Sequence, residues 1–136
     1  MKKVIIPAFI LLINIFLIGC TQTKKDTIAH SQNTYRQISM SEAQDIMNKE
    51  KDYIILDVRT QDEYKEGHIS NALCIPNETI GDKEIDKLPN KNQLIMVYCR
   101  SGNRSKQASE KLVKLGYTNI VEIGGIKDWQ GKIEKS

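Results

Sequence analysis

The sequence is poor in cysteine and carries little excess charge. Its 136 residues include three cysteines, none of them in a Cys-x-x-Cys pair, which excludes a disulfide scaffold. A net charge of +3 argues against a strongly basic nucleic-acid-binding protein, so no nucleic-acid partner is expected. No His, Cys or carboxylate cluster has metal-ligand spacing, and no phosphate-binding glycine motif precedes a helix. We therefore expect neither a metal nor another cofactor.

Long apolar runs are also absent, except at the start of the chain. After the basic Met1-Lys2-Lys3, thirteen of the fifteen residues from Val4 to Ile18 are apolar. Such a run is typical of a secretory signal and is short for a membrane-spanning helix. It ends in Leu17-Ile18-Gly19-Cys20, which resembles the lipobox of bacterial lipoproteins. The resemblance implies a signal peptide over residues 1–19, cleavage before Cys20 and a diacylglycerol on the Cys20 thiol. An uncleaved anchor or an ordinary signal peptide is the alternative.

Residues 20–34 form the expected link between lipid and domain. Thr21–Thr34 contains one strongly apolar residue, Ile28, as is typical of a flexible tether. His30 is interpreted as a solvated tether residue rather than a ligand. The predicted location is the extracytoplasmic face of a bacterial membrane, with the lipid on Cys20 as the only membrane contact.

The remaining residues, 35–136, are enough for one packed core and alternate between strand and helix patterns. Strands are predicted over 35–38, 53–56, 72–75, 94–98 and 119–123. Helices are predicted after Ser39, over 60–65, 80–88 and 105–115, and around Trp129. Ser39 with Glu42 and Thr60 with Glu63 have the spacing of helix capping boxes. The alternation predicts an α/β fold with a mainly parallel sheet.

The most informative stretch is the loop after the strand at 94–98. It places Cys99 between a strand end and a helix start, where unpaired N–H groups favour a thiolate. Arg100 and Arg104 add positive charge, and Gly102 can take the positive φ that lets loop amides converge on one centre. The pattern predicts an exposed loop with a nucleophilic cysteine. The alternative is that Cys99 is a buried cysteine with a structural role only.

Over roughly Gln37 to Ile133, the chain resembles the rhodanese homology domain, single-domain type. The matching pieces are Leu56-Asp57-Val58-Arg59, Glu63-Tyr64, Gly67-His68-Ile69, Ala72, Ile75-Pro76, Val97 to Ser105, Gly116-Tyr117, Gly124-Gly125 and Trp129. The resemblance implies a three-layer sandwich with a five-stranded, mainly parallel sheet and helices on both faces. It also implies a sulfurtransferase in which Cys99 carries sulfane sulfur as a persulfide. The expected persulfide cradle is Arg100, Ser101, Gly102, Asn103 and Arg104. A small anionic sulfur donor, a thiol or protein acceptor and a monomeric state complete the expectation.

Two other functions are weighed against this one. Phosphatases that resemble rhodaneses have five residues between the loop Cys and Arg, a ring that fits phosphate. Here four residues separate Cys99 from Arg104, and Tyr98 rather than His precedes the cysteine, which favours a single sulfur atom. The other alternative is a module that carries or senses reactive sulfur, or docks a partner, without turnover.

Several further residues could take part in chemistry, but their patterns favour structural roles. Asp57, Arg59 and Glu63 are interpreted as an ion-pair and capping cluster, His68 as a hydrogen-bonding residue, and Trp129 as a packing residue. Cys74 is most simply a small buried hydrophobe. Its alternative role is to resolve the Cys99 persulfide as a disulfide.

Overall fold

The structure is a computed structural model, and it describes residues 34–136. The predicted signal peptide, Cys20 and nearly all of the tether lie outside the described residues. Within the described part, no helix is long and apolar enough to span a membrane.

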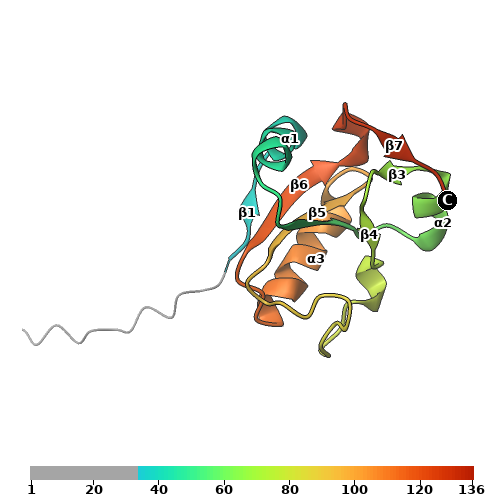
Figure 1. Cartoon of the computed structure of the whole chain (residues 1–136). Helices are drawn as coiled ribbons and strands as arrows, with labels where there is room; N and C mark the ends of the chain where they lie inside the picture. The colour runs from blue at the N-terminus through green and yellow to red at the C-terminus, as the bar shows by residue number, and fades with distance from the viewer. Residues whose placement is uncertain (1–33) are drawn as a thin grey trace, which may run out of the picture. The chain divides into compact units, whose positions relative to one another are not determined.

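The centre of the domain is a five-stranded parallel sheet, in the order β1-β6-β5-β2-β4 (Figure 1). In that order the strands are Arg36–Gln37, Ile120–Gly125, Leu94–Cys99, Tyr53–Asp57 and Leu73–Cys74. The two longest strands, β5 and β6, are central neighbours. The prediction of a mainly parallel five-stranded sheet is confirmed.

Strand β5 shows why this part of the sequence is continuously apolar. Ile95 and Val97 pack into a cluster on one face of the sheet, whereas Met96 and Tyr98 pack into a cluster on the other. A strand buried on both faces needs apolar residues at every position, as parallel sheets usually do. Cys99 follows in the alternation and joins the cluster of Ile95 and Val97.

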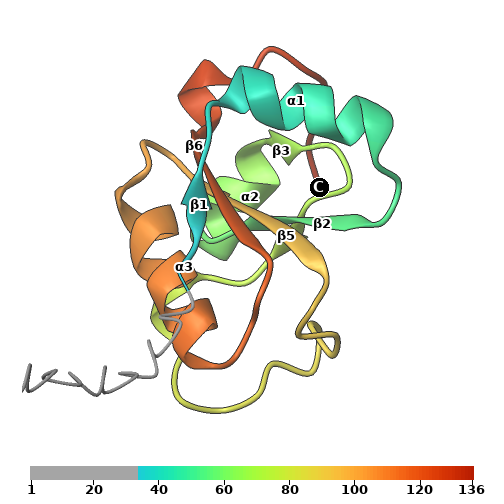
Figure 2. The same cartoon turned by 90° about the vertical axis from the view of Figure 1, so that its left-hand side faces the viewer.

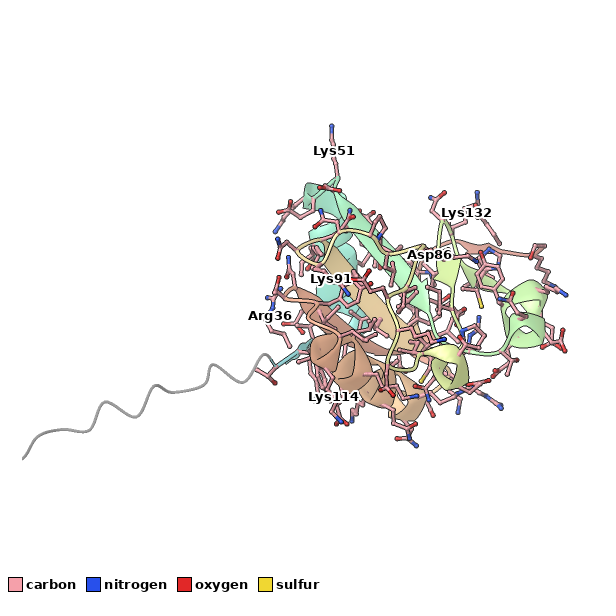
Figure 3. The ribbon with its side chains drawn as sticks, turned by 90° about the horizontal axis from the view of Figure 1, so that it is seen from below. Arg36, Lys51, Asp86, Lys91, Lys114 and Lys132 are labelled. Atoms are coloured by element: carbon pink, nitrogen blue, oxygen red, sulfur yellow. The ribbon has the colours of Figure 1, made fainter. Side chains whose placement is uncertain are left out.

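Helices cover both faces of the sheet, so the predicted three-layer arrangement is confirmed. Helix α1 (Met40–Lys49) packs on the face of Met96, and α3 (Asn103–Lys114) packs on the face of Val97. Figure 2 shows α1 and α3 on opposite sides of the strands. The exposed side chain of Lys51 projects away from the ribbon beyond the end of α1 (Figure 3).

Both predicted capping boxes are present. The Ser39 hydroxyl accepts from the Glu42 N–H, and the Glu42 carboxylate accepts from the Ser39 N–H. Thr60 and Glu63 repeat the arrangement at the start of α2 (Gln61–Glu66). Each box satisfies N–H groups that the first helical turn leaves unpaired.

The predicted helix over 80–88 is wrong. A short 3-10 helix, η1 (Asn77–Thr79), precedes it, and the segment itself is irregular. Ile80 and Leu88 are buried against the α3 side of the core, and the Leu88 carbonyl accepts from the Tyr117 hydroxyl at 2.7 Å. These tertiary contacts hold the segment at its two ends without requiring helical backbone between them.

Three smaller differences concern element ends and a second sheet. Helix α3 begins at Asn103, two residues before the predicted start. A further 3-10 helix, η2 (Ile126–Asp128), ends just before Trp129, around which a helical stretch is predicted. The unpredicted feature is a two-stranded antiparallel sheet of β3 (His68–Ile69) and β7 (Ile133–Glu134). This small sheet lies beside α2, where the Ser136 N–H donates to the Lys65 carbonyl (Figure 1).

Candidate active site

Cys99 is the last residue of β5 and is followed directly by the loop that leads into α3. Its exposed fraction is 1%, so the prediction of an exposed cysteine loop is wrong at its centre. The physical reason is that the alternation of β5 turns Cys99 toward the α3 face. The neighbouring Arg100 and Ser101 are exposed.

Hydrogen-bond donors surround the Cys99 sulfur. The Gly102 N–H donates to Sγ at 3.0 Å, and the Ser105 hydroxyl lies 3.5 Å from it. Burial is the largest single influence on the thiol and raises its pKa. The Ser105 hydroxyl, with the N–H groups of Ser105, Gly102 and Ser101, outweighs it and lowers the pKa below its ordinary value. A thiolate is the nucleophilic form of cysteine, so the site favours the reactive species.

Gly102 makes this geometry possible. Its φ is +102°, in the left-handed region that L side chains rarely adopt, and it is the residue before α3. The predicted positive φ is confirmed. The turn directs its N–H at Sγ and sets the start of α3, where the partial positive charge of the helix lies, beside the sulfur.

The two loop arginines have different surroundings. Arg104 makes a two-pronged ion pair with Glu63 of α2, with N–O distances of 2.7 and 2.8 Å. Glu63 therefore neutralises much of the positive charge that Arg104 adds to the loop. Arg100 is exposed and lines a cavity of about 500 Å³ together with Lys127, which is also exposed. Arg100 and Lys127 are the exposed cations of this cavity, which Glu63 and Glu66 also line.

The ion pair predicts a pH effect on stability. The Arg104 guanidinium holds the pKa of Glu63 at about 2, below its ordinary 4.5. A carboxylate with a lowered folded-state pKa stabilises the fold above its unfolded-state pKa and loses that contribution as the pH falls. We expect Glu63→Gln to lower the free energy of unfolding by about 0.5–1 kcal/mol at pH 7, because both partners are partly exposed.

The difference between wild type and Glu63→Gln should shrink as the pH falls from about 4.5 to about 2. Urea unfolding at pH 7 and pH 3 measures it. Asp62→Asn is the matched control. The Asp62 side chain is 93% exposed, and its one ion-pair contact, with Lys65 Nζ, is long at 3.9 Å. A Glu63→Gln penalty that stays constant across this range would contradict the assignment.

Asp57, Arg59 and Tyr98 form a buried network beneath the site. The Arg59 guanidinium binds the Asp57 carboxylate at 2.6–3.1 Å, and the Tyr98 hydroxyl donates to the same carboxylate at 2.6 Å. Arg59 Nη2 also donates to the Gly67 carbonyl at 2.7 Å. These contacts tie the end of β2 to β5 and to the end of α2, which is a structural role.

Cys74 is buried and separated from Cys99. It pairs in register with Asp57, which pairs in turn with Tyr98. Two inter-strand spacings, about 10 Å, exceed the roughly 7 Å that a disulfide spans between Cα atoms. Burial is the main cause that raises the pKa of Cys74 to about 11. The geometry favours the interpretation of Cys74 as a buried thiol over the resolving role.

The other singled-out residues have local partners. His68 stacks on the Tyr64 ring with centroids 3.6 Å apart, and its Nδ1 lies 2.8 Å from the Tyr64 carbonyl. Trp129 packs against the α1-side core, and its Nε1 donates to the Lys132 carbonyl. Among residues 34–136, no group of three or more His, Cys, Asp or Glu side chains could hold a metal ion.

Two residues contribute to the site although the sequence analysis assigns them no role there. Gly125 packs directly beneath the loop, where an added Cβ would lie 2.3 Å from the Arg100 carbonyl oxygen. Glu122 is buried beside Ser105, with Oε1 2.5 Å from the Ser105 hydroxyl oxygen. The Gly124-Gly125 pair and a charged residue within an apolar strand were the available signals.

Comparison with known proteins places the chain in a family. The family model described as the rhodanese-like domain matches residues 39–132. The chain belongs to the rhodanese-like domain family. The prediction of family and fold is therefore confirmed.

Relatives of this rhodanese-like chain include proteins named thiosulfate sulfurtransferase. It is 37% identical over 73 residues to the thiosulfate sulfurtransferase PspE of Escherichia coli, covering 54% of this chain and 70% of that protein. It is 36% identical over 97 residues to the thiosulfate sulfurtransferase GlpE of Coxiella burnetii, covering 71% and 88%. A solved structure described as a rhodanese with anions from E. coli superimposes with a TM-score of 0.57 at 33% identity, covering 62% and 99%.

Proposed function

We propose that this rhodanese-like protein is a sulfurtransferase that moves sulfane sulfur through a persulfide on Cys99. The observation that carries the proposal is the set of donors aimed at the Cys99 sulfur, led by the Gly102 N–H at 3.0 Å. Relatives named thiosulfate sulfurtransferase support this class of activity at the level of the family.

In the first half-reaction, the Cys99 thiolate attacks the outer sulfur of a donor such as thiosulfate. A new S–S bond forms to Sγ, the S–S bond of thiosulfate breaks, and sulfite leaves with the bonding electron pair. Cys99 then carries a persulfide anion. The loop N–H groups and the start of α3 stabilise the negative charge before and after the transfer.

In the second half-reaction, a nucleophilic acceptor attacks the outer sulfur of the persulfide. The S–S bond at Cys99 breaks, the thiolate is regenerated, and the acceptor leaves with the sulfur. Cyanide would leave as thiocyanate, and a thiol would leave as a persulfide. Neither half-reaction needs an external oxidant or reductant, because the sulfane sulfur is transferred at one oxidation level and each bonding electron pair stays with the leaving group.

The anionic donor would approach from the cavity that Arg100 and Lys127 line. Two exposed cations at its edge raise the local concentration of a dianion, an effect that salt screens. Glu63 and Glu66 line the same cavity, and Arg104 pairs with Glu63. We therefore assign donor attraction to Arg100 and Lys127, and loop anchoring to Arg104.

The functional alternatives differ in what they predict for turnover. A thiosulfate:cyanide assay with the purified protein should produce thiocyanate catalytically. Stable sulfur loading without thiocyanate would instead favour a carrier or sensor of reactive sulfur. Hydrolysis of an aryl phosphate would favour the phosphatase, which the four-residue spacing between Cys99 and Arg104 disfavours.

We further propose that the protein works at the extracytoplasmic face of a bacterial membrane, as a monomer attached through lipid on Cys20. The support is the lipobox resemblance at Leu17-Ile18-Gly19-Cys20 and the polar stretch that follows. One acyl chain binds membranes reversibly, whereas two or more chains anchor a protein stably.

Cys20→Ala tests this location. The variant should remain as the unprocessed precursor or leave the membrane fraction, because it lacks the thiol that accepts the lipid. Membrane fractionation with immunoblotting measures both outcomes, and Cys74→Ser is the cysteine control. Normal processing and full membrane retention of Cys20→Ala would contradict the lipid-anchor assignment.

A further inference from the structure

Glu122 is a buried carboxylate that the proposed reaction does not use. It lies in β6, is 3% exposed, and pairs in register with Val97 of β5. Its neighbours Val121 and Ile123 pack on the α1 face, so the alternation of the strand turns Glu122 toward α3. Cys99 belongs to the cluster on that same face.

Within residues 34–136, no cation pairs with this buried carboxylate. Among the described residues, none forms a salt bridge with Glu122, although a buried carboxylate is costly without partners. Its Oε1 accepts from the Ser105 hydroxyl at 2.5 Å and from the Gly124 N–H at 2.9 Å. A charged residue kept in the core on two hydrogen bonds suggests a role beyond packing.

Ser105 connects this carboxylate to the reactive sulfur. Its Oγ lies 3.5 Å from Cys99 Sγ, 2.5 Å from Glu122 Oε1 and 2.9 Å from the Gly102 carbonyl oxygen. A hydroxyl has one proton to donate. While Glu122 is ionised, that proton belongs to the charge-assisted bond with the carboxylate, and the oxygen is left to accept the S–H of Cys99. The Ser105 hydroxyl can therefore donate to the thiolate, and lower the pKa of Cys99, only when Glu122 is neutral.

We propose that Glu122 is a positioning residue that takes up, through the Ser105 hydroxyl, the proton that the Cys99 thiol releases. The thiol proton passes to Ser105 Oγ as the Ser105 proton passes to Glu122 Oε1. The neutral Glu122 carboxyl then donates to Ser105, and Ser105 donates to the thiolate. No proton is gained or lost by the three groups together. The inference rests on the proposed function in taking the thiolate as the attacking form.

The relay keeps the number of buried negative charges constant at one. Without it, a thiolate and a carboxylate would compete for one hydroxyl proton inside the core, where like charges repel strongly. With it, the charge moves from Glu122 to the sulfur, where the loop amides and the start of α3 are aimed. The relay also gives a residue that is 1% exposed an internal acceptor for its proton.

Tyr35 and Arg104 are two other ionisable groups that lie near Glu122 or Cys99. The pKa of Tyr35, beside β1, is raised mainly by burial and further by the negative charges of Glu110 and Glu122. Arg104 of α3 forms an ion pair with Glu63 of α2, which raises the pKa of Arg104, and the charge of Cys99 raises it further. Neither Tyr35 nor Arg104 titrates in the range where a thiol and a carboxyl exchange a proton.

The test follows the ionisation of Cys99 in the full chain. Its rate of alkylation by iodoacetamide is measured from pH 4 to pH 10 through the mass of the Cys99 peptide. Two groups that share a proton titrate in two macroscopic steps, so the wild-type profile should show two rises separated by a plateau. Glu122→Gln keeps an oxygen that accepts from Ser105 and Gly124 but cannot take the proton, so its profile should show one rise.

Glu110→Gln is the matched control, because Glu110 is an exposed carboxylate of α3, and it should keep both steps. Ser105→Ala is the second variant and should lower the plateau, because the thiolate loses its hydroxyl donor. A single rise in wild type, or two rises that persist in Glu122→Gln, would overturn the relay.

Alkylation needs no sulfur donor, so the relay and the proposed function can fail separately. Wild type that turns over thiosulfate but ionises in one step would refute the relay alone. Wild type that ionises in two steps but neither accepts nor transfers sulfur would refute the proposed function alone.

Discussion

Replacing Cys99 by Ser should abolish thiosulfate:cyanide sulfur transfer, leaving only the rate measured without protein. The hydroxyl of Ser is not ionised at neutral pH and cannot hold sulfane sulfur, whereas the surrounding donors would remain in place. The Gly102 N–H, 3.0 Å from Sγ, can donate to the new oxygen instead. The free energy of unfolding should therefore change by only about 1 kcal/mol.

Cys74→Ser is the matched control for this variant. Both cysteines are buried, but Cys74 lies two strands away from β5, the strand that ends at Cys99. Burial also raises the pKa of the Cys74 thiol. Its loss should leave kcat/KM unchanged while lowering the free energy of unfolding by about 1 kcal/mol, because a buried hydroxyl needs a partner. A Cys74→Ser protein that accepts sulfur but cannot release it to thiols would restore the resolving role.

Gly125→Ala should reduce kcat/KM by roughly 100-fold, the scale expected when a reacting group is displaced by about 1 Å. An added Cβ would lie 2.3 Å from the Arg100 carbonyl oxygen and 2.7 Å from the Ser101 Cα. Both contacts are to backbone, so the loop that follows Cys99 has to move away. Overpacking of this kind should also lower the free energy of unfolding by about 1–3 kcal/mol. Steady-state kinetics and urea unfolding measure the two effects.

Gly81→Ala is the control for Gly125→Ala. A Cβ at Gly81 meets nothing within 4 Å, so activity and stability should stay close to wild type. If Gly125→Ala retained wild-type kcat/KM, the position of the loop backbone would not limit sulfur transfer.

Local patterns in the sequence predicted much of the fold. The continuous apolar run from Leu94 to Tyr98 predicted the buried central strand, and two capping boxes predicted the starts of α1 and α2. In each capping box the interacting residues lie three positions apart in the chain. The predicted helix over 80–88 failed because distant contacts, such as the one from Tyr117 to Leu88, determine that segment.

The candidate site divides in the same way. The cysteine loop and the positive φ of Gly102 were predicted because strand end, glycine and helix start are contiguous. The partner of Arg104 is Glu63, 41 residues away, and the partner of Ser105 is Glu122, 17 residues away. Only the packing of α2 and β6 around α3 brings these groups together. For the same reason, burial of Cys99 to 1% exposure could not be predicted from an apparently polar loop.

Intact-mass measurement of the protein before and after thiosulfate tests the central claim most directly. The account predicts a gain equal to the mass of one sulfur atom, located on the peptide that contains Cys99 and discharged by cyanide. Cys99→Ser should show no gain, and Cys74→Ser should gain one sulfur atom as wild type does. A sulfur atom located on Cys74, or catalytic thiocyanate formation with Cys99→Ser, would contradict the account.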